Sequence, residues 1–77
     1  EHNMATFTTG DYITYRGKAA YPSLQTLRID YIKGKGAETT TAIAGGCSVD
    51  NLANYRAATS EEIARFEEME KRAYNKI

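Results

Sequence analysis

The chain is short of the residues on which most catalytic and metal sites are built. Its 77 residues include one cysteine (Cys47), one histidine (His2), one proline and no tryptophan. A zinc site needs clustered Cys or His, and a Ser-His or Cys-His nucleophile pair needs a histidine beside the nucleophile. A single cysteine also allows no disulfide within the chain. We therefore expect no metal site, no cofactor and no catalytic residues, so the chain is not predicted to be an enzyme.

The lone histidine stands outside the part of the chain that looks native. Glu1, His2 and Asn3 precede Met4, which is a plausible natural start. We interpret residues 1–3 as the remnant of an expression tag. The protein itself would then contain no histidine.

Excess charge of either sign is also lacking. The chain has ten basic and ten acidic residues and a pI near 6.9. The basic footprint typical of nucleic-acid-binding domains is therefore missing. No run of 18 apolar residues occurs, so no membrane span and no membrane partner are predicted. The unpaired cysteine fits a reducing compartment, and we expect a cytoplasmic protein.

Aliphatic residues are few. Ile, Leu, Val and Phe together number 12, while six tyrosines supply further apolar bulk with a polar tip. A chain of this length buries only about 60% of its extended-chain surface. The composition predicts one small core of modest stability, and it favours added stabilisation by self-association.

The composition changes once, near Thr59. Gly, Thr, Tyr and Ile dominate before it, and Glu, Lys, Arg and Ala after it. We interpret residues 4–59 as a β-rich body and residues 60–77 as an amphipathic helix packed on the same domain. Alternating and β-branched residues predict five strands, separated by turn signals at 34–36 and 45–46, over residues 11–16, 26–31, 39–44, 47–49 and 55–57.

The predicted helix has a clear start signal. Thr59 and Glu62 have the spacing of a capping box. A stripe of mostly apolar residues should face the body, and it consists of Ile63, Phe66, Glu70, Ala73, Tyr74 and Ile77. Three i,i+4 ion pairs are predicted on the other side, namely Glu61–Arg65, Glu67–Lys71 and Glu68–Arg72.

The element order, together with residues 55–63, resembles a known family. A strand, a loop, a long strand, two hairpin turns, a helical turn and a last strand follow one another. Tyr55 to Ile63 then matches an "R-x-A-T-x-E-E-I" ending. This is similar to small SH3-like barrel proteins of bacteria and their phages that carry a C-terminal helix. The resemblance implies an α+β, mainly β fold: an SH3-like small barrel or a bent five-stranded antiparallel sheet. The chain lacks the tryptophan of proline-binding SH3 domains, so PxxP recognition does not carry over.

The predicted function is that of a non-catalytic binding module for a protein partner or for itself. One alternative is a nucleic-acid-binding small barrel, which would use aromatic platforms and scattered basic residues. Another is a small-ligand binder or enzyme. The candidate binding surface consists of Tyr12, Arg16, Tyr21, Arg28, Lys33 and Lys35.

Self-association, giving a homodimer, has two candidate surfaces. Strand 39–44 carries no charge that would block pairing at a sheet edge. The C-terminal part of the helix is expected to extend beyond the β-rich body. Its candidate contact residues are Met69, Glu70, Tyr74 and Ile77. Glu70 has two interpretations at this point. It lies in water at the edge of the apolar stripe, or it is a partner charge at an interface.

Overall fold

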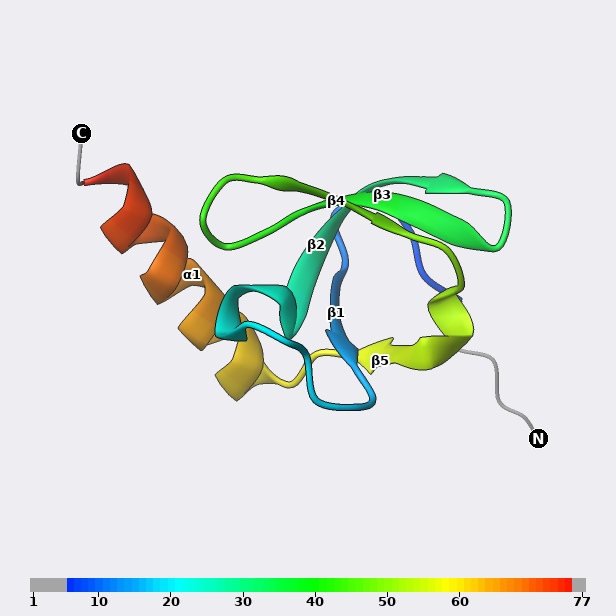
Figure 1. Ribbon diagram of the computed structural model, residues 1–77, viewed down its shortest axis with the longest axis horizontal. Helices are drawn as coiled ribbons and strands as arrows, with labels where there is room; N and C mark the ends of the chain where they lie inside the picture. The colour runs from blue at the N-terminus through cyan, green and yellow to red at the C-terminus, as the bar shows by residue number, and fades with distance from the viewer. Residues whose placement is uncertain (1–5, 76–77) are drawn as a thin grey trace.

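The computed structural model describes residues 6–75, in which a β-sheet is followed by one helix (Figure 1). The sequence-predicted helix and all five predicted strands are present, although several bounds differ. In chain order the elements are β1 (Tyr12–Tyr15), the 3₁₀ turn η1 (Pro22–Leu24), β2 (Thr26–Lys33), β3 (Gly36–Thr40), β4 (Gly46–Val49), the 3₁₀ turn η2 (Leu52–Asn54), β5 (Tyr55–Ala57) and α1 (Ser60–Tyr74).

The five strands form one antiparallel sheet in the order β4-β3-β2-β1-β5. Strands β2, β3 and β4 follow one another as hairpins, and β5 returns to pair with β1. Among the described residues, β4 and β5 do not pair, so the sheet is bent but is not closed into a barrel. The predicted fold class, a five-stranded antiparallel sheet with one C-terminal helix, is confirmed.

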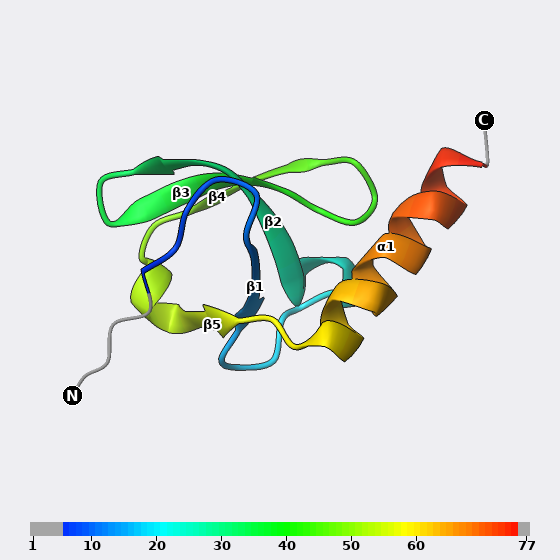
Figure 2. The ribbon, with the colours of Figure 1, turned by 180° about the vertical axis from the view of Figure 1, so that it is seen from behind.

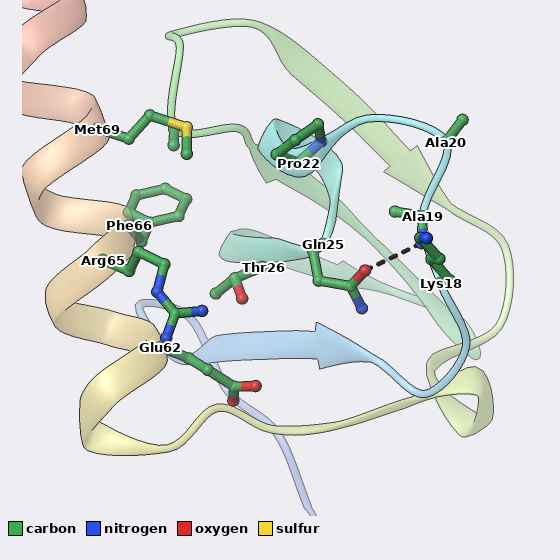
Figure 3. Close-up of a pocket in the computed structure, with 11 residues that line it drawn as sticks. Lys18, Ala19, Ala20, Pro22, Gln25, Thr26, Glu62, Arg65, Phe66 and Met69 are labelled. Carbon is green, nitrogen blue, oxygen red and sulfur yellow. Dashed lines mark hydrogen bonds between the residues drawn. The ribbon is translucent and has the colours of Figure 1, made fainter.

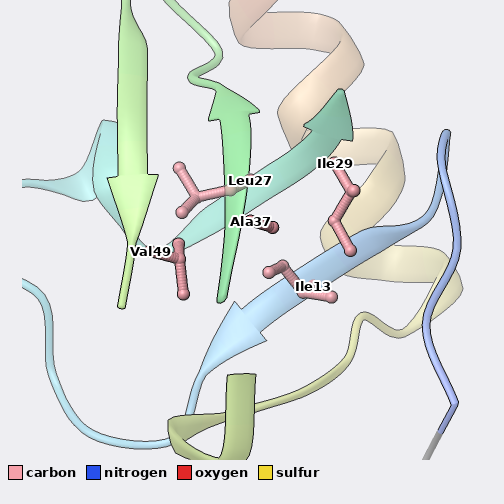
Figure 4. Close-up of a cluster of buried hydrophobic side chains, with 5 residues drawn as sticks. All are labelled: Ile13, Leu27, Ile29, Ala37 and Val49. Atoms are coloured by element: carbon pink, nitrogen blue, oxygen red, sulfur yellow. The ribbon is translucent and has the colours of Figure 1, made fainter. Parts of the chain in front are cut away.

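The main core lies on one face of this sheet, which we call the inner face. Ile13 pairs across the strands with Leu27, and both side chains are fully buried. Ile29, Ala37 and Val49 complete the buried cluster (Figure 4). Half-buried side chains surround the cluster, namely Phe7, Cys47, Leu52 and Tyr55. A core this small matches the scarcity of aliphatic residues in the sequence.

Helix α1 covers the opposite, outer face of the same strands. Side chains alternate along a strand, so Tyr12 and Thr14 point away from the core that holds Ile13. Thr14 is nevertheless 1% exposed, because α1 lies over it. Strand β1 is therefore buried on both faces. The distal end of α1 extends beyond the sheet (Figures 1 and 2).

The third strand and its turn differ from the prediction. Residues 39–44 were expected to be a strand, but β3 ends at Thr40 and residues 41–45 form the turn to β4. Ala44 adopts a left-handed conformation with φ 68°, which is uncommon for a residue with a Cβ and typical of a tight turn. Strand β3 lies between β2 and β4. The prediction that strand 39–44 offers a free sheet edge is therefore wrong.

A β-bulge changes the faces along β2. The alternation of Leu27, Ile29 and Tyr31 predicts that all three face the core. The pairing with β3 shifts between Ile29 and Tyr31, which turns the following side chains to other faces. Tyr31 is consequently 54% exposed.

Gly36 was expected to be a turn residue, but it is the first residue of β3 and is buried. A Cβ at Gly36 would overlap the backbone carbonyl oxygen of Val49. The absence of a side chain therefore lets β3 and the end of β4 approach each other closely.

We expect Gly36→Ala to lower the free energy of unfolding by about 2–4 kcal/mol, because a backbone atom must move to admit the methyl group. Urea denaturation followed by circular dichroism measures this. Gly46→Ala is the matched control, since a Cβ at Gly46 meets no atom within 4 Å. Equal stability of the two variants would contradict the close approach.

Phe66 should be the main apolar anchor of α1. It is the one buried residue within α1, at 3% exposure. Phe66→Ala should cost about 3–5 kcal/mol of unfolding free energy. Tyr74→Ala, at a residue 75% exposed on the same helix, should cost less than about 0.5 kcal/mol. If α1 were not docked on the sheet, chemical denaturation would show similar losses of unfolding free energy for the two variants.

Candidate functional site

Two of the six predicted binding residues are covered by α1. The rings of Tyr12 and Phe66 pack edge to face with centroids 5.2 Å apart. The Arg28 guanidinium lies 5.5 Å from the Phe66 ring centroid and forms an ion pair with Glu70 at 3.0 Å. Tyr12 and Arg28 therefore hold the helix in place and do not form an open surface.

The other four predicted residues are dispersed over the molecule. The Arg16 Nε donates a hydrogen bond to the Ala53 carbonyl oxygen at 3.2 Å. Lys33 is the last residue of β2 and Lys35 lies in the β2–β3 turn, at the end of the sheet opposite to α1 (Figure 1). Tyr21, which is 66% exposed, lies in the long β1–β2 loop. The six residues consequently do not share one surface.

Glu62 joins the start of α1 to two strands of the sheet. Its carboxylate accepts two hydrogen bonds from the Arg56 guanidinium, at 2.8 and 2.7 Å. It also accepts one from the Thr59 backbone N–H at 2.8 Å and one from the Thr14 hydroxyl at 3.0 Å. The Thr59 hydroxyl accepts from the Glu62 N–H in return, which confirms the predicted capping box.

These four donors stabilise the charged form of the Glu62 carboxyl. The hydrogen bonds from Arg56 contribute most, followed by the Thr59 backbone N–H, and they lower the pKa of Glu62 from 4.5 to about 2. Thr14 in turn hydrogen-bonds the Thr26 hydroxyl at 3.0 Å. One carboxylate thus fixes the first turn of α1 against β1 and β5.

The distal half of α1 shows how the self-association candidates lie. Glu70 is neither free in water nor exposed as a partner charge, because Arg28 of the same chain binds it. Met69 is half-buried, Tyr74 is 75% exposed, and Ile77 lies outside the described residues. Of the three predicted i,i+4 ion pairs, all within residues 61–72, only Glu68–Arg72 forms, at 3.2 Å.

A cavity of about 350 Å³ opens between α1, the β1–β2 loop and the β3–β4 turn (Figure 3). Phe66 and Met69 of α1 line one side, and Pro22 lies across from them. Buried Ala42 of the β3–β4 turn also lines the cavity. Its polar lining residues are Lys18, Gln25, Thr26, Glu62 and Arg65.

A second, more open hollow of about 630 Å³ adjoins the first, and Pro22 and Met69 line both. Leu24 contributes to its lining. Tyr21 and Ile43 stand at its rim, and they are 66% and 57% exposed. The two hollows form one mainly apolar depression, which we call the α1 groove. Its further lining residues are Ala19, Ala20, Ser23, Thr41 and Gly45.

Hydrogen bonds fix both loop walls of the α1 groove. The Gln25 amide donates to the carbonyl oxygens of Tyr15 and Gly17 and accepts from the Ala19 N–H, each at 2.9 Å. In the β3–β4 turn, the Thr41 N–H donates to the Gly45 carbonyl at 2.7 Å, and the Thr41 hydroxyl accepts from the Gly45 N–H at 3.0 Å. These hydrogen bonds define the shape of both loops.

The side chains of the described residues provide groups for binding, and they do not form a metal cluster. Within residues 6–75 no three His, Cys, Asp or Glu side chains cluster closely enough to hold a metal ion. Cys47 is half-buried against the core and lies outside the groove. In the same part of the chain no helix is long and apolar enough to cross a membrane.

Comparison of the chain with protein-family models, with curated proteins and with solved structures finds no match. No family is therefore assigned to it.

Most residues of the α1 groove were missed at the sequence level. Ile43 falls within the predicted strand 39–44, and no binding role is predicted for Pro22. The available signal was a pair of large apolar residues, Tyr21 and Ile43, close to the turn residues of two loops. That two such loops meet beside α1 depends on the tertiary fold.

The lowered pKa of Glu62 predicts a specific pH dependence. Because the pKa is lower in the folded state than in the unfolded chain, the stabilisation is present above about pH 4.5 and is lost as the pH falls toward 2. Glu62→Gln should lower the unfolding free energy at pH 7 by about 2 kcal/mol and flatten its decline between pH 4.5 and 2. Urea denaturation at several pH values measures both effects.

Glu67→Gln, at an exposed position of the same helix, is the matched control and should leave the profile unchanged. If the unfolding free energy of Glu62→Gln falls between pH 4.5 and 2 as steeply as that of the unsubstituted chain, Glu62 is not the group that causes the loss of stability in acid.

Proposed function

We propose that the protein is a non-catalytic interaction module that binds a segment of another protein in the α1 groove. The observation that carries this proposal is the pair of large apolar side chains, Tyr21 and Ile43, exposed at the rim of a hollow with apolar walls. Clustered exposed apolar side chains beside a concave surface are typical of interaction sites.

The stiffness of the walls supports the same proposal. Gln25 and Thr41 hold the two loops by hydrogen bonds, and Glu62 and Phe66 hold the helix. A site that is formed before the ligand arrives costs less conformational entropy on binding. Ala44 keeps a left-handed backbone in the turn that carries Ile43, and such strained residues are often found at functional sites.

We further propose that the chain is related to SH3-like small barrels, with a sheet that stays open between β4 and β5 and with an added helix. The pairing order, with β5 beside β1 and the 3₁₀ turn η2 between β4 and β5, supports this relation. The α1 groove lies between the added helix and the body, so binding there does not require the tryptophan that the chain lacks.

Nucleic-acid binding has less support than protein binding. The basic and aromatic residues considered for it are separated: α1 covers Tyr12 and Arg28, and Lys33 and Lys35 lie at the far end of the sheet. An extended basic surface with stacking aromatic side chains would be needed.

Selection of displayed random peptides against the protein tests the proposal. Peptides that bind should lose at least about tenfold in affinity for Ile43→Glu and Met69→Glu, because each change places a charge in an apolar contact. Ile32→Glu, at a residue 39% exposed and near the β2–β3 turn, is the matched control and should not alter binding. Thermal melts establish that each variant is folded. Selected peptides that bind all three variants equally would overturn the proposal.

A further inference from the structure

The polar groups that remain free in the α1 groove indicate the chemistry of its occupant. This inference rests on the proposed function, since it concerns the ligand of the same groove. A groove with apolar walls gains its selectivity from the few polar groups that are left for the ligand.

The neutral polar side chains of the smaller hollow, Gln25 and Thr26, are engaged within the protein. Both N–H groups of the Gln25 amide donate to backbone carbonyls, and its oxygen accepts from Ala19. The Thr26 hydroxyl is bound to the Thr14 hydroxyl. These groups shape the walls of the groove, and they offer little hydrogen-bonding capacity to a ligand.

The negative charge in the groove is compensated. Glu62 accepts two hydrogen bonds from Arg56, and the two groups together carry no net charge. A basic ligand would have to displace the bidentate hydrogen bonds of Arg56 in order to bind this carboxylate. The site therefore does not favour a cation.

Two cations remain. Arg65 lies on the α1 wall and Lys18 on the opposite wall, in the β1–β2 loop (Figure 3). Within residues 6–75 neither side chain forms an ion pair or a hydrogen bond, and the expected Glu61–Arg65 pair is not formed. The polar part of the groove thus has a local charge of about +2 in a protein whose formal net charge is zero.

We propose that the α1 groove binds an acidic, apolar segment of a partner protein. One or two aliphatic or aromatic side chains of the segment pack between Met69, Pro22 and Ile43. Neighbouring Asp or Glu carboxylates pair with Arg65 and Lys18. Such charge complementarity selects the partner and speeds its association.

A second copy of this chain fits the groove less well. The exposed apolar residue at the end of its helix, Tyr74, lies one turn from Lys71, which forms no ion pair within residues 6–75. Inserting that end would bring like charges together around Arg65 and Lys18. An extended segment also suits two joined hollows of about 350 and 630 Å³ that open to solvent, whereas small-molecule sites enclose most of the ligand surface.

The test is a random-peptide selection run in parallel on the full chain and on the charge-reversed variant Lys18→Glu/Arg65→Glu. Peptides from the unsubstituted chain should be enriched in Asp and Glu next to apolar residues. Each single reversal should weaken their binding about three- to fivefold, and the effect should shrink at high salt. Peptides selected on the double variant should lose the acidic preference. The control is Lys33→Glu/Lys35→Glu, at the far end of the sheet. Peptides selected on this variant should still be enriched in Asp and Glu.

The outcomes separate this inference from the proposed function. Peptides whose binding is lost with Met69→Glu but which show no acidic preference would overturn the inference and leave the interaction module standing. Peptides that ignore Met69→Glu would overturn both. Sedimentation of the protein alone, up to submillimolar concentration, tests whether a second copy of the chain occupies the groove. A dimer that dissociates in the Met69→Glu variant would show that the second copy is the ligand, and this would contradict the inference.

Discussion

The structure depends on the contact between Glu62 and the sheet. The Glu62 carboxylate meets its four hydrogen bonds from three segments of the chain: β1, β5 and the turn that begins α1. Hydrogen bonds to a charged acceptor are about twice as strong as those between neutral groups. One side chain therefore caps the helix, pairs with Arg56 and satisfies a buried threonine hydroxyl. This combination sets where α1 starts and how its first turn lies on the sheet.

The docked helix gives this small chain a second buried surface. The inner core is formed by only five buried apolar residues, which is little for a domain. On the outer face, Phe66 packs against Tyr12 and Arg28, and Arg28 is paired with Glu70. Beyond this contact α1 leaves the sheet, and its Met69 side faces the two loops. The α1 groove thus results from where the helix is held.

Local patterns in the sequence predicted the elements well, and tertiary features account for what they missed. The capping box at Thr59 and the strand 55–57 follow from side-chain chemistry and periodicity. The bulge in β2 and the close approach at Gly36 do not, because each depends on the strand that pairs alongside. The groove was missed for the same reason: Tyr21 and Ile43 are far apart in sequence. Glu70 remained ambiguous because its partner, Arg28, lies 42 residues away.

The α1 groove requires that α1 is docked against the outer face of β1, since this contact creates the groove wall. The most direct measurement is a nuclear Overhauser spectrum of the protein in solution. The edge-to-face arrangement, with ring centroids 5.2 Å apart, predicts strong cross-peaks between the ring protons of Tyr12 and Phe66. A helix over residues 60–74 that shows no cross-peaks to β1 or β2 would contradict the account.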